Sequence, residues 1–261
     1  MPHAADFDPD TAPRQTMVLS VPYKPGIGDW HAHRRAQLIH ASEGVVTVQT
    51  KSGHWVVPPQ RAVWMPPGER HCVSSRRGYQ LTTVYIGRSA GLPTRPAVVA
   101  VSALLDELLK AAALAGGKYP RQGPAARLMR VLLDQLPTEL LTHEIPSLHL
   151  PEPRDARLRR MMAPVLADPA CPTGLAELAA AAGLSMRSAS RMFLMETGLT
   201  PGDWRTQRRL LSALEALIQG ESVTQVALAV GYQDTSSFIA VFRRAFGVTP
   251  GSMAKVIGAT G

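Results

Sequence analysis

An internal repeat constrains this chain of 261 residues more than any other feature. The stretch GLSMRSASRMFLMETGLTP, residues 183–201, recurs 48 to 49 positions later as GYQDTSSFIAVFRRAFGVTP, residues 231–250. Each copy follows a short apolar segment, begins with a glycine turn and continues as a helix that ends at a second glycine. Ser185 and Asp234 stand where they would cap the second helices. The repeat therefore predicts two helix-turn-helix motifs.

The segment between the two copies sets their separation. DWRTQRRLLSALEALIQ, residues 203–219, would span about 25 Å as one helix at 1.5 Å per residue. Two recognition helices held that far apart can enter successive major grooves on one face of B-DNA, whose helical repeat is about 34 Å. A solenoid would need about three copies or more, and this chain has two.

At these residues the chain resembles the AraC/XylS family of bacterial transcription regulators. The resemblance covers residues 158–250 and rests on LAELAAAAGLSMRSASRMF, ETGLTP, RRLLSAL and VALAVGYQDTSSFIAVFRRAFGVTP. It implies a double-stranded DNA operator as the partner, with RNA polymerase as a further candidate. The base-reading positions that it implies are Arg187, Ser190 and Arg191 in the first recognition helix, and Thr235, Ser236, Ile239 and Ala240 in the second.

The two recognition helices differ at these positions. Arg187 and Arg191 are four residues apart, so they share a helical face from which an arginine can pair with guanine. The alternative is that both are solvated surface arginines. Ala240 stands where the family most often has Arg, so we expect weak reading of the second half-site. Arg243 and Arg244 fit phosphate clamping better than base reading.

The first half of the chain has a different pattern. Short β-prone runs such as VVTVQT, HWVV and AVWM alternate with Gly and Pro turns, which predicts a β-sandwich or barrel. VSALLDELLKAAALA and AARLMRVLLDQL then predict two amphipathic helices. The expected fold is a two-domain α+β protein, with a cupin-like β-barrel (residues 15–90), two connector helices (97–145) and an all-α double helix-turn-helix domain (153–253). PSLHLPEPRD, residues 146–155, is expected to be a proline-stiffened linker.

The apolar stripes of the two connector helices must be buried against something. They comprise Leu104, Leu105, Leu108 and Leu109 on the first helix and Leu128, Val131, Leu132 and Leu136 on the second. Packing on the barrel and a homodimer interface both satisfy this requirement, and a homodimer is the expected assembly.

Three histidines form a candidate site in the barrel. His31, His33 and Gln37 have even spacing, so a regular strand would point all three to one face, and His71 ends the later motif PPGERH. Converging imidazoles could hold a divalent metal such as Zn, Ni or Fe. Alternatively they hydrogen-bond a small-molecule effector in an aromatic pocket. The expected pocket residues are Trp30, His31, His33, Gln37, Trp55, Trp64 and His71, and the three histidines are the candidate metal ligands.

GIGDWHAHRRAQLIHASEG and PPGERH resemble the two sequence elements of a cupin. Gln37 stands where metal-binding cupins have Glu, and Ser75 stands where the second element often ends in Asn. A neutral amide is a weaker ligand than a carboxylate and leaves the charge of a metal uncompensated. With both halves considered, the chain resembles the AraC subfamily whose members often control neighbouring transporter genes, including nitroimidazole-type drug efflux.

Charge and composition narrow the function classes. The net charge of +8 suits a polyanionic partner. No apolar run approaches the roughly 18 residues of a membrane span, and the acidic start is unlike a secretory signal, so we expect a cytoplasmic protein with no membrane partner. Cys72 and Cys171 lack CxxC spacing, which argues against a disulfide framework or thiolate cluster. The rival to a DNA-binding regulator is a metal-dependent oxygenase or isomerase, but no catalytic residues are predicted.

Overall fold

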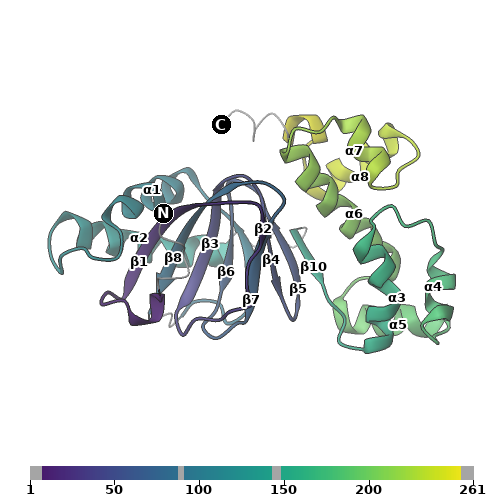
Figure 1. Ribbon diagram of the computed structural model, residues 1–261, viewed down its shortest axis with the longest axis horizontal. Coiled ribbons are helices and arrows are strands. Elements are labelled where there is room, and N and C mark those ends of the chain that lie inside the picture. Colours follow the sequence, from purple (N-terminus) through teal and green to yellow (C-terminus); the bar gives the residue numbers. More distant parts are fainter. Residues whose placement is uncertain (1–7, 88–90, 143–147, 254–261) are drawn as a thin grey trace. The chain divides into compact units, whose positions relative to one another are not determined.

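The computed structural model describes residues 8–87, 91–142 and 148–253. The chain divides into two compact units, residues 1–51 with 55–148 and residues 52–54 with 149–261 (Figure 1). Within the described ranges, every helix is too short or too polar to span a membrane.

Ten strands form two five-stranded sheets among the described residues (Figure 1). The first sheet has the order β1 (Thr16–Tyr23), β8 (Tyr79–Ile86), β3 (Ala36–Glu43), β6 (Arg61–Met65) and β9 (Ala97–Ala100). The second has the order β10 (His149–Pro151), β5 (Gly53–Val57), β4 (Val46–Thr50), β7 (His71–Ser75) and β2 (Gly26–Ile27). Two sheets followed by helices agree with the predicted β-rich N-terminal part.

Helices α1 (Ala103–Ala115) and α2 (Pro124–Thr142) cover one face of the first sheet. Leu38 of β3 lies opposite Trp64 of β6 and Val84 of β8, and all three are fully buried in the core that these helices complete. Side chains alternate between the two faces of a strand. Gln37, next to Leu38, therefore points to the other face of the sheet.

Some apolar residues of the connector helices pack on the first sheet, whereas others are exposed. Leu105, Leu109, Leu132 and Leu136 are buried on the sheet, so packing on the barrel is confirmed for them. Leu104 is 55% exposed, Leu114 is 92% exposed and Val131 is 50% exposed. The predicted homodimer therefore applies to these three exposed side chains of α1 and α2.

The predicted proline-stiffened linker is wrong in part, because three of its residues form β10 in the second sheet. The backbone N–H of Glu152 donates to the carbonyl of Ser52 at 3.0 Å. Gly53 is required here, since a Cβ would lie 2.3 Å from the carbonyl oxygen of Leu150. A partner about a hundred residues away leaves no local signal in the sequence.

Six helices form the second unit among the described residues: α3 (Ala156–Ala167), α4 (Leu175–Ala181), α5 (Met186–Thr197), α6 (Pro201–Ile218), α7 (Val223–Ala229) and α8 (Thr235–Phe246). Helices α4 and α5 form one pair joined by a short turn, and α7 and α8 form a second pair of the same kind. The predicted caps are confirmed, since Ser185 Oγ accepts from Ser188 N–H at 3.1 Å and Asp234 Oδ1 accepts from Ser237 N–H at 2.7 Å. The 18 residues of α6 span about 27 Å.

Half-buried arginines of α6 hold the end of α3 and the segment that precedes α4. Arg208 donates to the carbonyl of Leu166, Arg209 to that of Pro169, and Arg205 to that of Thr173. These carbonyls lie at the end of α3 and in the segment that leads to α4. Part of the positive charge of this unit is therefore structural.

Candidate DNA-binding surface and effector site

The predicted arginines lie on the exposed face of α5. Ala189 and Phe193 are fully buried, so the opposite face of the helix points to solvent. Arg187 and Arg191 are exposed on that face, and Ser190 is half-buried beside it. Both arginines lie in the N-terminal half of α5, the half that contacts base edges when a recognition helix enters the major groove.

Helix α8 has the same buried face but a different exposed one. Phe238 and Phe242 are fully buried. Thr235 and Ile239, two of the predicted base-reading residues, are only half-exposed. The exposed side chains are Ser236, Ser237, Ala240, Arg243 and Arg244.

The two helices match when α8 is aligned 49 positions after α5. Arg187 and Arg191 then correspond to Ser236 and Ala240. Two exposed apolar residues at the C-terminal end of α5, Leu194 (51%) and Met195 (79%), correspond to Arg243 and Arg244. Positive charge therefore lies near the start of α5 and near the end of α8. The sequence analysis did not include Leu194 and Met195 in the exposed face of α5. Their helical spacing from Arg187 and Arg191 was the available signal.

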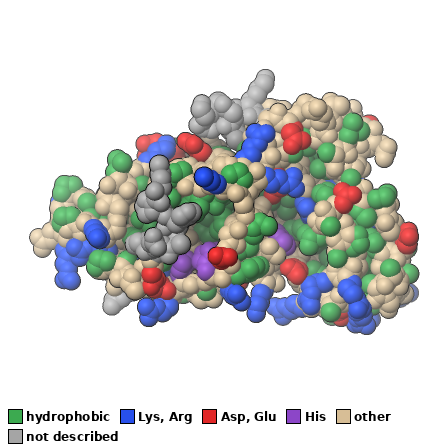
Figure 2. Space-filling model, in the orientation of Figure 1, with side chains coloured by type: hydrophobic (Ala, Val, Ile, Leu, Met, Phe, Trp, Pro, Cys, Tyr) green, Lys and Arg blue, Asp and Glu red, His purple; other side chains and the backbone are tan. Residues whose placement is uncertain are grey.

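Basic side chains gather on part of the helical unit. Figure 2 shows a group of Lys and Arg along one edge of this unit, and histidine side chains that reach the surface of the β-rich unit. Dense positive charge on one side favours binding to phosphates.

The histidine cluster is formed by an isolated β-bridge rather than by a strand. His31 N–H donates to the carbonyl of His71 at 3.0 Å, and His71 N–H donates back at 2.9 Å. The imidazoles of His31, His33 and His71 each offer a nitrogen, and these atoms all lie within 4.8 Å of one another. The predicted convergence is present, but its reason was wrong, because β3 begins only at Ala36 and residues 32–35 are not a strand.

Backbone carbonyls orient two of these rings. His31 Nδ1 lies 2.8 Å from the carbonyl oxygen of Asp29, and His71 Nδ1 lies 2.9 Å from that of Glu69. A ring that donates through Nδ1 keeps the Nε2 lone pair free for a ligand. The Nε2 atoms of His33 and His71 are buried and have no hydrogen-bond partner among the described residues.

Burial favours the neutral form of His33 and His71. It lowers the pKa of His71 to about 4, and it also lowers the pKa of His33, with the neighbouring His31 as the second cause. A neutral imidazole is the form that binds metal. Sites with three imidazole ligands bind Zn and related metals, so the donors present fit a divalent transition metal.

Gln37 is held in one orientation beside the cluster. The hydroxyl of Thr83 donates to the carbonyl of Leu38 at 3.1 Å, so it must accept from Gln37 Nε2, which lies 2.9 Å away. Gln37 Nε2 also lies 3.2 Å from the hydroxyl of Tyr85, whose ring packs edge-on against His33 at 5.1 Å. The Oε1 atom of Gln37 is buried without a partner in the described structure.

Other predicted pocket residues are dispersed. Trp64 lies on the helix-facing side of the first sheet, where its indole donates to the carbonyl of Pro93, so its assignment to a pocket with Gln37 was wrong. The reason is strand parity, since Trp64 lies opposite Leu38 rather than Gln37. Trp30 is 40% exposed beside His31, and Trp55 is buried in β5. For these two the pocket role remains a prediction.

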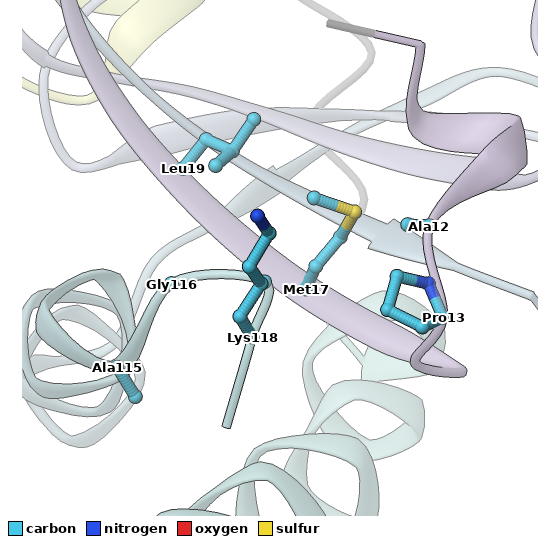
Figure 3. Close-up of a pocket in the computed structure, with 8 residues that line it drawn as sticks. Ala12, Pro13, Met17, Leu19, Ala115, Gly116 and Lys118 are labelled. Carbon is cyan, nitrogen blue, oxygen red and sulfur yellow. The ribbon is translucent and has the colours of Figure 1, made fainter. Parts of the chain in front are cut away.

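An apolar cavity is lined by other residues than the three histidines (Figure 3). Its volume is about 360 Å³, and it is open to one side. Its lining comes from the start of the chain, β1 and the turn after α1: Ala12, Pro13, Met17, Leu19, Ala115, Gly116, Gly117 and Lys118. No local sequence pattern indicates this cavity, because its walls come from segments about a hundred residues apart.

Two family models match the chain. An AraC-like ligand-binding domain matches residues 24–144, and a helix-turn-helix domain matches residues 178–255. The HTH-type transcriptional regulator NimR of Escherichia coli K12 is 34% identical over 222 residues, which are 85% of this chain and 80% of NimR. The HTH-type transcriptional regulator RipA of Corynebacterium glutamicum is 40% identical over 111 residues, which are 42% of this chain and 33% of RipA.

A solved structure of ToxT from Vibrio cholerae aligns over 93% of this chain and 98% of that chain, with 10% identity and a TM-score of 0.39, a level at which no residue role is transferred. NimR carries the stronger relation, because the shared sequence extends through both the β-rich and the helical parts. The chain is therefore a member of the AraC family of transcriptional regulators, with an AraC-like ligand-binding domain and a helix-turn-helix domain.

Proposed function

We propose that this regulator binds an operator in double-stranded DNA with α5 and α8 in successive major grooves. The observation that carries the proposal is the duplicated helix-turn-helix separated by α6, with Arg187 and Arg191 exposed on α5. Arginine pairs with guanine through two hydrogen bonds, so α5 is the base-reading helix in this proposal. Arg243 and Arg244 bind phosphates near the other half-site.

A footprint of the full chain on its own upstream DNA tests this proposal. We expect protection across two successive helical turns per protomer, and an affinity that falls linearly in log–log form with salt. The double variant Arg187→Ala/Arg191→Ala should lose the footprint while keeping weak binding to any DNA. Failure of the wild-type protein to retard any DNA at low salt would instead indicate an interaction module.

We further propose that His31, His33 and His71 hold a divalent metal through which the effector acts. Support comes from the nitrogens within 4.8 Å of one another and from the two buried Nε2 atoms without partners. A bound metal would supply an open coordination position for a small ligand. Untagged protein purified without chelator should contain about one metal per chain. His33→Ala should lose it, and His54→Ala, a histidine outside the cluster, should keep it; metal-free wild-type protein would leave an organic-effector pocket.

We infer that two copies associate through the exposed apolar side chains of α1 and α2. Leu104, Leu114 and Val131 are half-exposed or more, although they lie on helices whose other face is buried. Light scattering should give twice the chain mass, and Leu114→Glu should halve it. Leu194→Glu, an equally drastic change on α5, is the matched control; a monomeric wild-type protein would contradict the inference.

A further inference from the structure

The donors around the histidine cluster are all neutral. Three imidazoles supply nitrogens. The neutral amide of Gln37 is linked to the cluster through Tyr85, whose hydroxyl lies 3.2 Å from Gln37 Nε2 and whose ring packs against His33, and it stands where a carboxylate would have cancelled one positive charge. Of the described acidic residues, none joins the group that could hold a metal. Asp10 and Asp8 act on His33 through space. The Asp10 carboxylate accepts hydrogen bonds from the backbone N–H groups of Arg34 and Arg35 at 2.9 and 3.2 Å.

Hydrogen bonds prevent the side chain of Gln37 from adopting another orientation. Its side chain is 3% exposed, and its amide nitrogen is fixed by Thr83 and Tyr85. The Thr83 hydroxyl is itself committed to the carbonyl of Leu38, so a flipped amide would place two acceptors against each other. The Gln37 amide therefore keeps a single orientation in this site.

A divalent cation among neutral donors keeps both of its charges. In a partly buried site this charge is costly unless an anion accompanies it. His71 is 1% exposed, whereas His31 is exposed, so the cluster is closed on one side and open to solvent on the other. A small anion can therefore approach the cluster from the side of His31.

From these observations we infer that the effector is a small anion, a carboxylate or an oxyanion of similar size, that binds together with the metal. Gln37 is the residue that determines this specificity, because a carboxylate at the same position would supply the missing charge. The inference rests on the proposed metal site and names the ligand class of that site.

Cobalt(II) serves as the probe, because its visible spectrum reports changes in its ligands. The full chain is first titrated with cobalt in a buffer free of carboxylates, and then with acetate and with azide. We expect uptake of about one cobalt per chain, followed by a saturable change of the spectrum with either anion. No cobalt uptake would overturn the metal proposal. Uptake without any anion response would overturn only the present inference.

Gln37→Glu assigns the response to this residue. We expect the variant to bind cobalt at least as tightly as the wild type, with the response to acetate weakened tenfold or more. Gln122→Glu adds the same charge at an exposed position in the turn between α1 and α2 and should respond like the wild type. An unchanged acetate response in a Gln37→Glu protein with a normal thermal transition would remove Gln37 from the account. The wild-type titration stands whether or not this variant folds.

Discussion

Helices α5 and α8 have the same framework, but their exposed faces carry different side chains. Both are 12 residues long, both begin with a side-chain cap, and both end at a glycine in the left-handed region, Gly198 and Gly247. Phe193 and Phe242 occupy the same buried position. The exposed positions differ, with arginines at the start of α5 and at the end of α8. The repeat therefore preserves what folding requires, whereas the exposed faces that we propose for DNA binding have diverged.

The shared framework makes the largest prediction. Phe193→Ala and Phe242→Ala should each destabilise the helical unit by about 3–5 kcal/mol, because each removes a fully buried ring. Urea unfolding followed by helical circular dichroism measures both losses. Leu194→Ala, on the exposed face of α5, should change stability by less than about 0.5 kcal/mol. A large loss in only one of the two Phe variants would show that the copies are not equivalent in folding.

The two turn glycines, Gly183 and Gly231, should differ in how much an alanine substitution destabilises the helical unit. Gly183 and Gly231 both have positive φ, so alanine at either site costs about 1–2 kcal/mol. Gly231 has an additional requirement, because a Cβ there would lie 2.9 Å from Ala170 Cα and 2.8 Å from Arg209 Nη2. Gly231→Ala should therefore lower the thermal midpoint clearly more than Gly183→Ala. Equal losses would mean that α6 and its neighbours can shift without cost.

The arginines at the end of α8 should strengthen binding to DNA of any base sequence. Arg243→Ala should weaken specific and non-specific DNA binding alike and reduce the salt slope by about 1, because one phosphate contact is lost. Gel-shift titrations at several salt concentrations measure both quantities. A loss of preference at one base position would instead assign Arg243 to base reading.

The smallest expected difference between the two helices is in how their N-terminal caps, Ser185 and Asp234, respond to pH. Hydrogen bonds from the Ser237 backbone N–H and hydroxyl hold the pKa of Asp234 below its usual range, whereas Ser185 does not titrate. Because the folded pKa is the lower one, this cap stabilises α8 above about pH 4 and loses its effect as the pH falls through the folded pKa. The advantage of wild type over Asp234→Ser in thermal midpoint should shrink on acidification; a pH-independent difference would contradict this.

The sequence predicted the repeated features best, because caps and glycine turns depend on local spacing. The histidine cluster was predicted for the wrong reason, since His31 meets His71 through a bridge and not through a regular strand. The orientation of Trp64 could not be deduced without knowing which residues begin β3 and β6. The pairing of β10 and the roles of the α6 arginines depend on partners distant in sequence.

The central claim is that α5 reads bases whereas α8 mainly positions the protein. Selection of bound sites from randomised DNA by the wild type and by Arg191→Ala tests it most directly. The wild type should show strong guanine preference in one half-site and weak preference in the other. Arg191→Ala should lose about 1–3 kcal/mol of specific binding at one position in the strong half-site. Equal preference in both half-sites, or a uniform loss over all sequences, would contradict the claim.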